Sequence, residues 1–237
     1  MYFNSIIIDA DNNPPLDGIS INKNFIKVNN VLLIDIIVNT YCNLDKKATI
    51  VLNNKDLRTA EHLNNYVDKV LINETPKGAL PSAALGVGNL RDSTSPIVIC
   101  PANALIPRKS FLEFINFMVE SNVSAGMVTF CSDDPNYSFI RVDKSGNIIE
   151  IVEKKVISNF ATAGIFYYKT KKEFIDSCRW SLVNNVATHD KFYLAPSLNY
   201  FVTRKKLIKN FRIESSEYSR LSAIDGKMDY FGEILII

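Results

Sequence analysis

The strongest constraint on the fold is an alternation of two hydrophobic patterns along the first half of the chain. Short apolar runs rich in β-branched residues recur at residues 5–9, 48–52, 68–72, 96–100 and 125–130. Stretches with helical periodicity stand between several of them, at residues 56–67, 82–91 and 109–122. Strands and helices in alternation predict an α/β protein with a mostly parallel central sheet and helices on both faces. Such sheets bind ligands at the carboxyl ends of their strands.

The pattern changes after Phe130. Two strand-like runs within residues 137–154 are joined by an Asp-Lys-Ser-Gly-Asn turn at residues 143–147, which suits a hairpin. The rest of the chain predicts a strand, two helices and a last strand, at residues 162–169, 171–183, 191–203 and 205–215. Because no composition break or proline-rich linker appears, we expect a single domain over residues 1–237 with a mixed sheet.

Composition excludes several classes of function. The 237 residues include 27 basic and 25 acidic side chains, a net charge of +2, which does not indicate a nucleic-acid-binding face. No signal-peptide pattern or apolar run long enough to span a membrane occurs, so we expect a cytoplasmic protein without a membrane partner. The four cysteines form no C-x-x-C pair, and the two histidines, His62 and His189, lie far apart in the sequence. We therefore interpret the histidines as isolated surface or half-buried side chains rather than as part of a zinc site or a catalytic triad.

The loop after the first strand is unusual for a nucleotide-binding α/β protein. Such loops are commonly rich in glycine, because backbone N–H groups must approach a phosphate closely. Here the strand ends at Asp9 and the loop continues as Ala-Asp-Asn-Asn-Pro-Pro, with a second carboxylate at Asp11. Two carboxylates repel a triphosphate unless a cation intervenes. The loop therefore predicts a weakened triphosphate site.

Several segments, in order along the chain, resemble the sugar-phosphate nucleotidyltransferases, the nucleotide-sugar pyrophosphorylases of surface-polysaccharide pathways. The similar segments are residues 21–41, 74–90, 96–106, 128–177 and 189–202. The most specific of them runs from the turn at residues 143–147 through Glu153 and Lys154 to an Ala-Gly-Ile-aromatic strand. The resemblance implies a single-domain, Rossmann-like (GT-A-type) nucleotidyltransferase fold. It also implies transfer of a nucleotide from a triphosphate to a sugar phosphate, with release of pyrophosphate.

The resemblance implies that the triphosphate side of the site is degenerate. Lys23 stands at the position of the family's catalytic lysine, whereas the glycines and the arginine of the family's loop are missing. Asp11 lies in that loop and would act in catalysis only by recruiting a cation. The family holds a catalytic Mg²⁺ with two aspartates. Asn103 takes the position of one, and near the C-terminus Asp225 and Asp229 are both candidates for the other, with Asp225 chosen as the metal ligand. Asparagine offers Mg²⁺ one neutral oxygen where a carboxylate is preferred.

The sugar side of the site is better preserved. By resemblance, Glu153 would accept hydrogen bonds from sugar hydroxyls and Lys154 would neutralise the sugar phosphate. Gly164 matches a glycine that lets a ligand approach the backbone. The base-recognition loop is matched by Thr75, Lys77 and Gly78, and Asn103 is a further substrate-binding candidate. Without the resemblance, Glu153 and Lys154 would be interpreted as an exposed strand-end ion pair.

The expected function is binding of a sugar phosphate, a nucleotide or a nucleotide sugar, with weak or lost catalysis. The first alternative is an active, divergent nucleotidyltransferase. A lower alternative is a haloacid-dehalogenase-type phosphatase with Asp9 as nucleophile and Asp11 beside it, since such enzymes begin with a strand and Asp-x-Asp. A further alternative is a glycosyltransferase of related fold, which would bind a metal through the acidic residues at 133–134. Within the segments similar to the nucleotidyltransferases, these residues lie in a loop between strands. The oligomeric state stays open between a homo-oligomer and a complex with a partner subunit.

Overall fold

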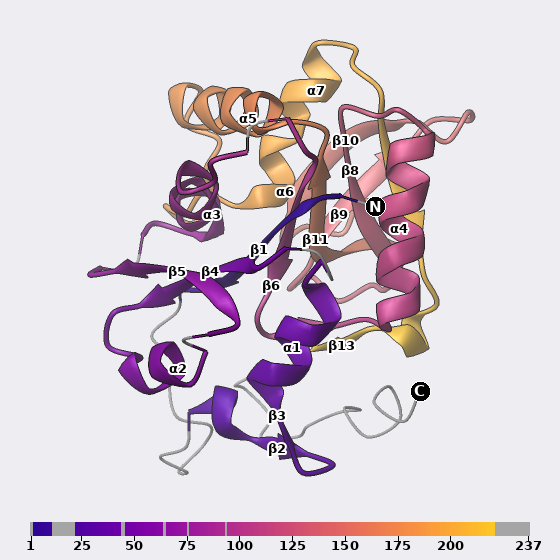
Figure 1. Ribbon diagram of the computed structural model, residues 1–237. Coiled ribbons are helices and arrows are strands. Elements are labelled where there is room, and N and C mark those ends of the chain that lie inside the picture. Colours follow the sequence, from indigo (N-terminus) through magenta and orange to yellow (C-terminus); the bar gives the residue numbers. More distant parts are fainter. Residues whose placement is uncertain are drawn as a thin grey trace.

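The computed structural model describes residues 2–10, 22–43, 46–63, 65–74, 76–92 and 94–220 (Figure 1). Its main feature is a nine-stranded sheet in the order β10-β9-β11-β6-β1-β4-β5, with β8 paired to β11 and β12 paired to β8. The strands are β1 (Asn4–Asp9), β4 (Ala48–Asn53), β5 (Val67–Ile72), β6 (Ile97–Pro101), β8 (Ala125–Cys131), β9 (Ser138–Val142), β10 (Ile148–Glu153), β11 (Phe160–Tyr168) and β12 (Ile208–Arg212).

The strands of the first half form the parallel part of the sheet. Strand β1 lies between β4 and β6 and pairs in parallel with both, and β5 extends the sheet beyond β4. The apolar runs are buried on both faces: Ile6 contributes to one hydrophobic core and Ile7 to the other. The chain passes from β1 to β4 on one side of β1, and β6 is added later on the other side. The carboxyl ends of β1 and β6 therefore flank a crevice at the point where the strand order reverses.

The second half makes the sheet mixed. Strand β11 is antiparallel to β6, β8 and β9, whereas β12 is parallel to β8. The hairpin predicted around residues 143–147 is present as β9 and β10. The sequence-based expectation of a mostly parallel mixed sheet with helices on both faces is confirmed.

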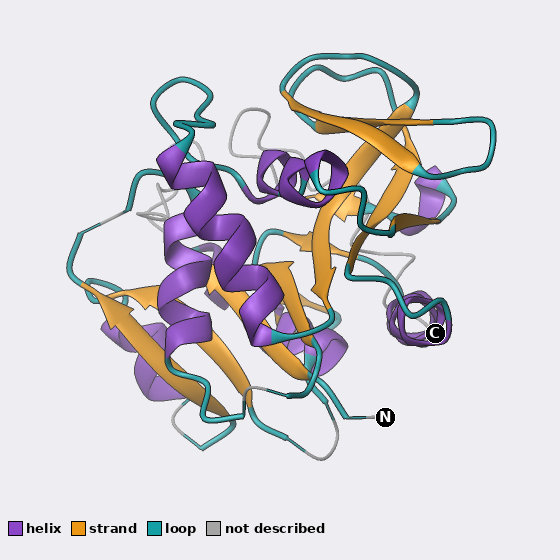
Figure 2. Cartoon of the chain, turned by 90° about the horizontal axis from the view of Figure 1, so that it is seen from above, coloured by secondary structure: helices purple, strands orange, loops and turns teal. Residues whose placement is uncertain are grey.

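Helices cover both faces of the sheet (Figures 1 and 2). On one face, side chains of α1 (Leu33–Tyr41), α2 (Leu57–His62) and α4 (Arg108–Glu120) join the core that contains Ile7. The opposite core, which contains Ile6, receives side chains of α3 (Ala79–Gly88), α5 (Lys171–Val183), α6 (Leu194–Ser197) and α7 (Asn199–Thr203). In the part of the chain that is described, no helix has both the length and the apolarity needed to cross a membrane.

Short elements complete the fold and carry residues of the site. Strand β2 (Lys27–Val28) pairs with β3 (Val31–Leu32) after the 3-10 helix η1 (Lys23–Phe25). Near the end of the described chain, the 3-10 helix η2 (Ser215–Glu217) leads into β13 (Ser219–Arg220), which pairs antiparallel with β7 (Ala104–Leu105).

Three predicted helices differ from those observed. The helix expected over residues 82–91 begins at Ala79 and ends at Gly88. The helix expected over residues 56–67 ends at His62, because Val67 already begins the edge strand β5. The single helix expected over 191–203 is two short helices, α6 and α7. Its first residues are extended, because the Phe192 backbone bonds to Lys77 O and Leu80 N, at 2.8 and 3.1 Å. Asn199, at the start of α7, bonds through its side chain to both backbone groups of Ile151 on β10, at 3.1 and 2.7 Å.

Candidate functional site

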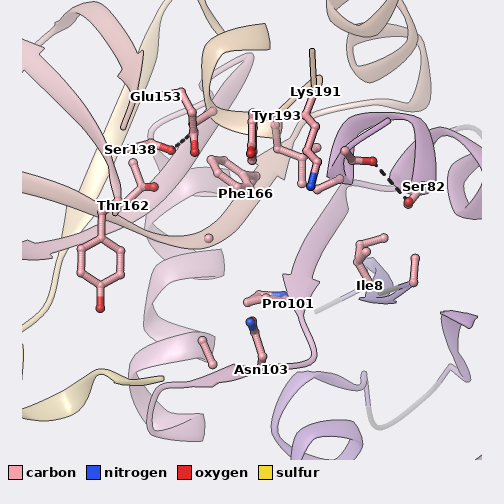
Figure 3. A pocket seen from close by; sticks show the side chains of 18 of the residues that line it. Ile8, Ser82, Pro101, Asn103, Ser138, Glu153, Thr162, Phe166, Lys191 and Tyr193 are labelled. Atoms are coloured by element: carbon pink, nitrogen blue, oxygen red, sulfur yellow. Dashed lines mark hydrogen bonds between the residues drawn. The ribbon is translucent and has the colours of Figure 1, made fainter. Parts of the chain in front are cut away.

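A pocket with a volume of about 620 Å³ opens at the carboxyl ends of β1 and β6 (Figure 3). Its walls come from β1, β6, β9, β10 and β11, from the start of α3, from residues 189–195 and from β13. The predicted residues that line it are Lys23, Lys77, Gly78, Asn103, Glu153, Lys154 and Gly164. The fold thus brings together residues that span more than half of the chain. Three further predicted residues, Asp11, Thr75 and Asp225, lie outside the described residues.

At one end of the pocket, an acidic and a basic side chain neutralise each other. Asp9, the last residue of β1, is only 4 % exposed and forms an ion pair with Lys23 Nζ. Its other carboxylate oxygen accepts a hydrogen bond from Asn24 Nδ2 at 2.6 Å. Asn24 is itself fixed by Thr59 Oγ1 at 3.1 Å. Because Lys23 is committed to Asp9, its charge is largely compensated before any ligand arrives.

Asn103 lies in the turn two residues after the end of β6 and lines the same end of the pocket, half-buried (Figure 3). Its amide is a poor substitute for the carboxylate that Mg²⁺ prefers. The carboxylate of Asp9 is already occupied by Lys23 and Asn24. Over the described residues, no group of three or more metal-ligating side chains occurs. Among the described residues, the donor set at this end of the pocket therefore does not fit a Mg²⁺ site.

Glu153, at the end of β10, occupies the opposite side of the pocket. It is paired across the hairpin with Ser138, whose hydroxyl donates a hydrogen bond to Glu153 Oε2 (Figure 3). Burial raises the pKa of Glu153, while the Ser138 hydrogen bond and the charges of Lys154 and Arg220 act in the lowering direction. Glu153 is thus a half-buried acceptor facing a cavity, rather than the exposed half of a strand-end ion pair.

Lys154 is held at the pocket by its backbone. It has a left-handed conformation with φ of 53°, and its N–H donates to the Tyr137 carbonyl at 3.0 Å. Its ammonium lies 5.4 Å from the centroid of the Tyr193 ring. Since a lysine rarely adopts a positive φ, the surrounding strands must fix this orientation.

Gly164 lies at an irregularity in β11, where the pairing with β8 shifts between Thr162 and Phe166. Its φ of 77° is a conformation that favours glycine. The shift places both Thr162 and Phe166 at the pocket wall (Figure 3). Gly164 therefore shapes this wall through its backbone conformation.

The predicted base-recognition loop forms a further wall. Gly78 precedes α3 with φ of 103°, and a Cβ atom there would lie 2.2 Å from the Phe192 carbonyl oxygen. Glycine is required at this position, because the loop packs directly on residues 188–193. That segment turns through His189 and Asp190, both with positive φ, and brings Lys191 to the pocket. His189 is exposed, in agreement with the interpretation of the histidines as surface or half-buried side chains, and it also lines the pocket.

Several residues that line the pocket were not predicted from the sequence. They are Tyr137, Ser138, Lys191, Tyr193, Tyr218 and Arg220. Lys191 and Tyr193 lie inside the similar segment 189–202, so a closer inspection of that segment could have selected them. Tyr218 and Arg220 carry no motif and reach the pocket only through the pairing of β13 with β7.

A family model described as nucleotidyl transferase matches residues 18–191, well over half of the chain. The chain belongs to the nucleotidyl transferase family. Among solved structures, a nucleoside-diphosphate-sugar pyrophosphorylase from Vibrio cholerae RC9 matches with a TM-score of 0.76 at 14 % identity, over 91 % of this chain and 94 % of that one. The inositol-1-phosphate CTP transferase from T. maritima matches with a TM-score of 0.71 at 15 % identity, over 94 % and 91 %. No curated protein sequence matches significantly.

The family assignment confirms the resemblance and the fold class. Nucleotidyl transferases of this group bind sugar phosphates and nucleotides and typically use Mg²⁺. The haloacid-dehalogenase alternative is not retained, since the fold and the family are those of nucleotidyl transferases and Asp9 is bound to Lys23 and Asn24.

Proposed function

We propose that this nucleotidyl transferase binds a sugar phosphate or a nucleotide sugar and has weak or no pyrophosphorylase activity by itself. Its place would be in nucleotide-sugar or surface-polysaccharide metabolism. The observation that carries the proposal is the Asp9–Lys23 ion pair. The lysine aligned with the family's phosphate-binding lysine is engaged by a buried carboxylate of its own chain.

The energetic argument concerns the charge of the triphosphate. Transfer of a nucleotidyl group depends on positioning and on neutralising the phosphate oxygens. In this chain the loop arginine is missing, a metal aspartate is replaced by Asn103 and Lys23 is paired internally. Each lost charge-assisted contact costs about 2–3 kcal/mol of transition-state stabilisation. Because about 1.4 kcal/mol corresponds to a factor of ten, turnover would fall by several orders of magnitude.

The sugar side of the pocket retains what binding requires. Glu153 offers acceptor oxygens beside Ser138 and Thr162, which suit sugar hydroxyls. Lys154 offers an ammonium that forms no ion pair with any described residue. Tyr193 and Phe166 supply flat apolar surface on the same side. This combination of a few polar groups with aromatic walls is typical of small-molecule sites.

The second candidate function is an active, divergent sugar-phosphate nucleotidyltransferase. The match of residues 18–191 to the family favours it, because the family is a family of enzymes. In that case Asp11 would bind a cation, and the cation would neutralise the triphosphate in place of the missing arginine.

Two measurements on the full chain separate these candidates. Calorimetric titrations with sugar phosphates and the four nucleoside triphosphates, each with and without Mg²⁺, should show tighter binding of a sugar phosphate. Pyrophosphate release across the same substrates should stay near background. Robust turnover that Asp11→Ala abolishes would establish the active enzyme instead. Tight triphosphate binding without any response to sugar phosphates would overturn the proposal.

A further inference from the structure

The basic side chains that line the pocket differ in whether they are ion-paired. Lysines 23, 77, 154 and 191 and Arg220 line it. Lys23 is ion-paired with Asp9, whereas the other four form no ion pair with a described carboxylate. Among these four are Arg220 and Lys154. Both nevertheless lie close enough to Glu153 to influence its pKa. Two of the four unpaired cations therefore lie on the Glu153 side of the pocket.

The backbone that carries Arg220 is held by several contacts. Its strand, β13, pairs with β7 so that Arg220 lies opposite Ala104, the residue after Asn103. The preceding Tyr218 stacks on Phe130, with ring centroids 4.2 Å apart and planes at 22°. Before it, Glu217 accepts a hydrogen bond from Ser110 of α4. The backbone that presents the guanidinium is thus attached to three separate elements.

Tyr137 links Arg220 to Lys154. The guanidinium carbon of Arg220 lies 5.3 Å from the centroid of the Tyr137 ring, while the Tyr137 carbonyl accepts the Lys154 N–H at 3.0 Å. A guanidinium over an aromatic face is held by a cation–π interaction, yet its N–H groups stay free to donate. One residue therefore positions the two cations on the same side of the pocket.

We infer that Arg220, on β13, binds the phosphate of the sugar phosphate together with Lys154. The inference rests on the proposed function, because it names the group that holds that ligand's phosphate. The planar guanidinium donates two parallel N–H bonds to phosphate oxygens, and Lys154 adds a point charge. Glu153 remains available for the sugar hydroxyls on the same ligand.

The test measures binding of glucose 1-phosphate and galactose 1-phosphate, and of the matching free sugars, by calorimetry. Arg220→Gln should lower the affinity for a bound sugar phosphate by about 10- to 100-fold, and leave that for the free sugar unchanged. Arg220→Lys should retain part of the affinity, since it keeps the charge but loses the bidentate geometry. Arg212→Gln is the matched control: Arg212 is also exposed and lies 5.6 Å from the Phe160 ring, but does not line the pocket.

A second arm keeps the inference separate from the proposed function. Inorganic phosphate is titrated into ¹⁵N-labelled protein while the side-chain Nε–Hε signals of arginine are followed. Arg220 should shift saturably and Arg212 should not. If no sugar phosphate binds but Arg220 shifts, the proposed function fails and the anion site stands. If the Arg220 signal does not respond, or if Arg220→Gln binds sugar phosphates like the wild type, the inference is overturned.

Discussion

Asp9 illustrates how a single buried carboxylate sets the character of a site. An ionised carboxylate at the end of a central strand is tolerated only with partners, and Lys23 and Asn24 provide them. The partners in turn lose their freedom, because Lys23 also donates to Asn24 Oδ1 at 3.1 Å. Local electrostatic satisfaction and phosphate binding therefore compete for the same ammonium.

Replacing Asp9 tests that competition. Asp9→Asn should destabilise the fold by about 1–3 kcal/mol, because it leaves Lys23, whose side chain is 14 % exposed, without its counter-charge. The same change should raise affinity for a nucleoside triphosphate, since the ammonium becomes available. Urea denaturation and calorimetry measure the two effects.

The control for Asp9→Asn is Asp92→Asn. Asp92 pairs with Lys46 at 2.7 Å, and neither residue lines the pocket. This variant should leave triphosphate affinity unchanged. Equal triphosphate affinity in wild type and Asp9→Asn, with the fold intact, would show that Lys23 is not restrained by Asp9.

Glu153 gives a prediction about pH. Because its pKa is raised, the folded protein favours the protonated form, and stability falls as the pH rises through that pKa. Glu153→Gln cannot ionise. Its stability relative to wild type should therefore increase from the ordinary glutamate range upward and level off above the raised pKa. Thermal or urea unfolding at a series of pH values measures this difference.

A neighbouring residue provides the comparison for Glu153. Glu150 lies on the same strand, but its carboxylate is paired with Arg141 at 3.0 Å. Glu150→Gln should show no gain in stability as the pH rises. A Glu153→Gln profile that runs parallel to wild type at all pH values would refute the prediction.

At the scale of elements, the central strands β1, β4, β6 and β8 were predictable because each is a short apolar run that is almost wholly buried. Helix α1 was not predicted, although its buried residues Leu33, Ile37 and Tyr41 recur at helical spacing. Most residues of this segment are apolar, so its helical hydrophobic periodicity does not stand out in the sequence. The division of residues 191–203 into α6 and α7 depends on contacts with residues 77–80 and Ile151, which are remote in sequence.

The two glycines at the ends of α3, Gly78 before it and Gly88 as its last residue, give a prediction about stability. Gly78→Ala should cost more than about 2 kcal/mol, because φ is 103° and the new methyl would overlap the Phe192 carbonyl. It should also weaken ligand binding, since the loop and residues 188–193 would separate. Gly88→Ala, at the end of the same helix and with open space around it, should be neutral or stabilising by up to about 1 kcal/mol. Equal unfolding midpoints for the two variants would contradict this account.

At the scale of the whole molecule, we propose that the chain is one domain. The two hydrophobic cores lie on opposite faces of shared strands: Val98 of β6 belongs to one and Ile99 to the other. Neither core can lose its packing without exposing the sheet that supports the other. Cooperative behaviour follows from this arrangement.

Unfolding in urea should accordingly occur in a single transition. Trp180, the only tryptophan, packs against the core that contains Ile6, so its fluorescence reports on that side. Far-UV circular dichroism reports on all elements. The two curves should coincide, with the same midpoint and slope. Two separated transitions would divide the chain into independent units.

The site could be predicted only in part from the sequence. Glu153 and Lys154 were predicted because they are adjacent and match a motif. Lys23, Lys77 and Asn103 were predicted because each lies close to a recognisable strand or helix. Arg220 was missed because nothing local distinguishes it. Its position depends on the pairing of β13 with β7, which joins residues more than a hundred positions apart. The pairing of Lys23 with Asp9 was missed for a related reason, since residue type alone does not show which charges neutralise one another.

The location of the free cations also has a kinetic consequence. Arg220 lies on a paired strand, and Lys154 directly follows one and is held by the hydrogen bond from its backbone N–H to the Tyr137 carbonyl, so their field exists before a ligand binds. An approaching phosphate is then attracted over distances comparable with the Debye length, about 8 Å at physiological salt. Ionic strength should consequently act on the rate of association far more than on the lifetime of the complex. A protein built in this way would capture its ligand quickly when salt is low and more slowly as salt rises.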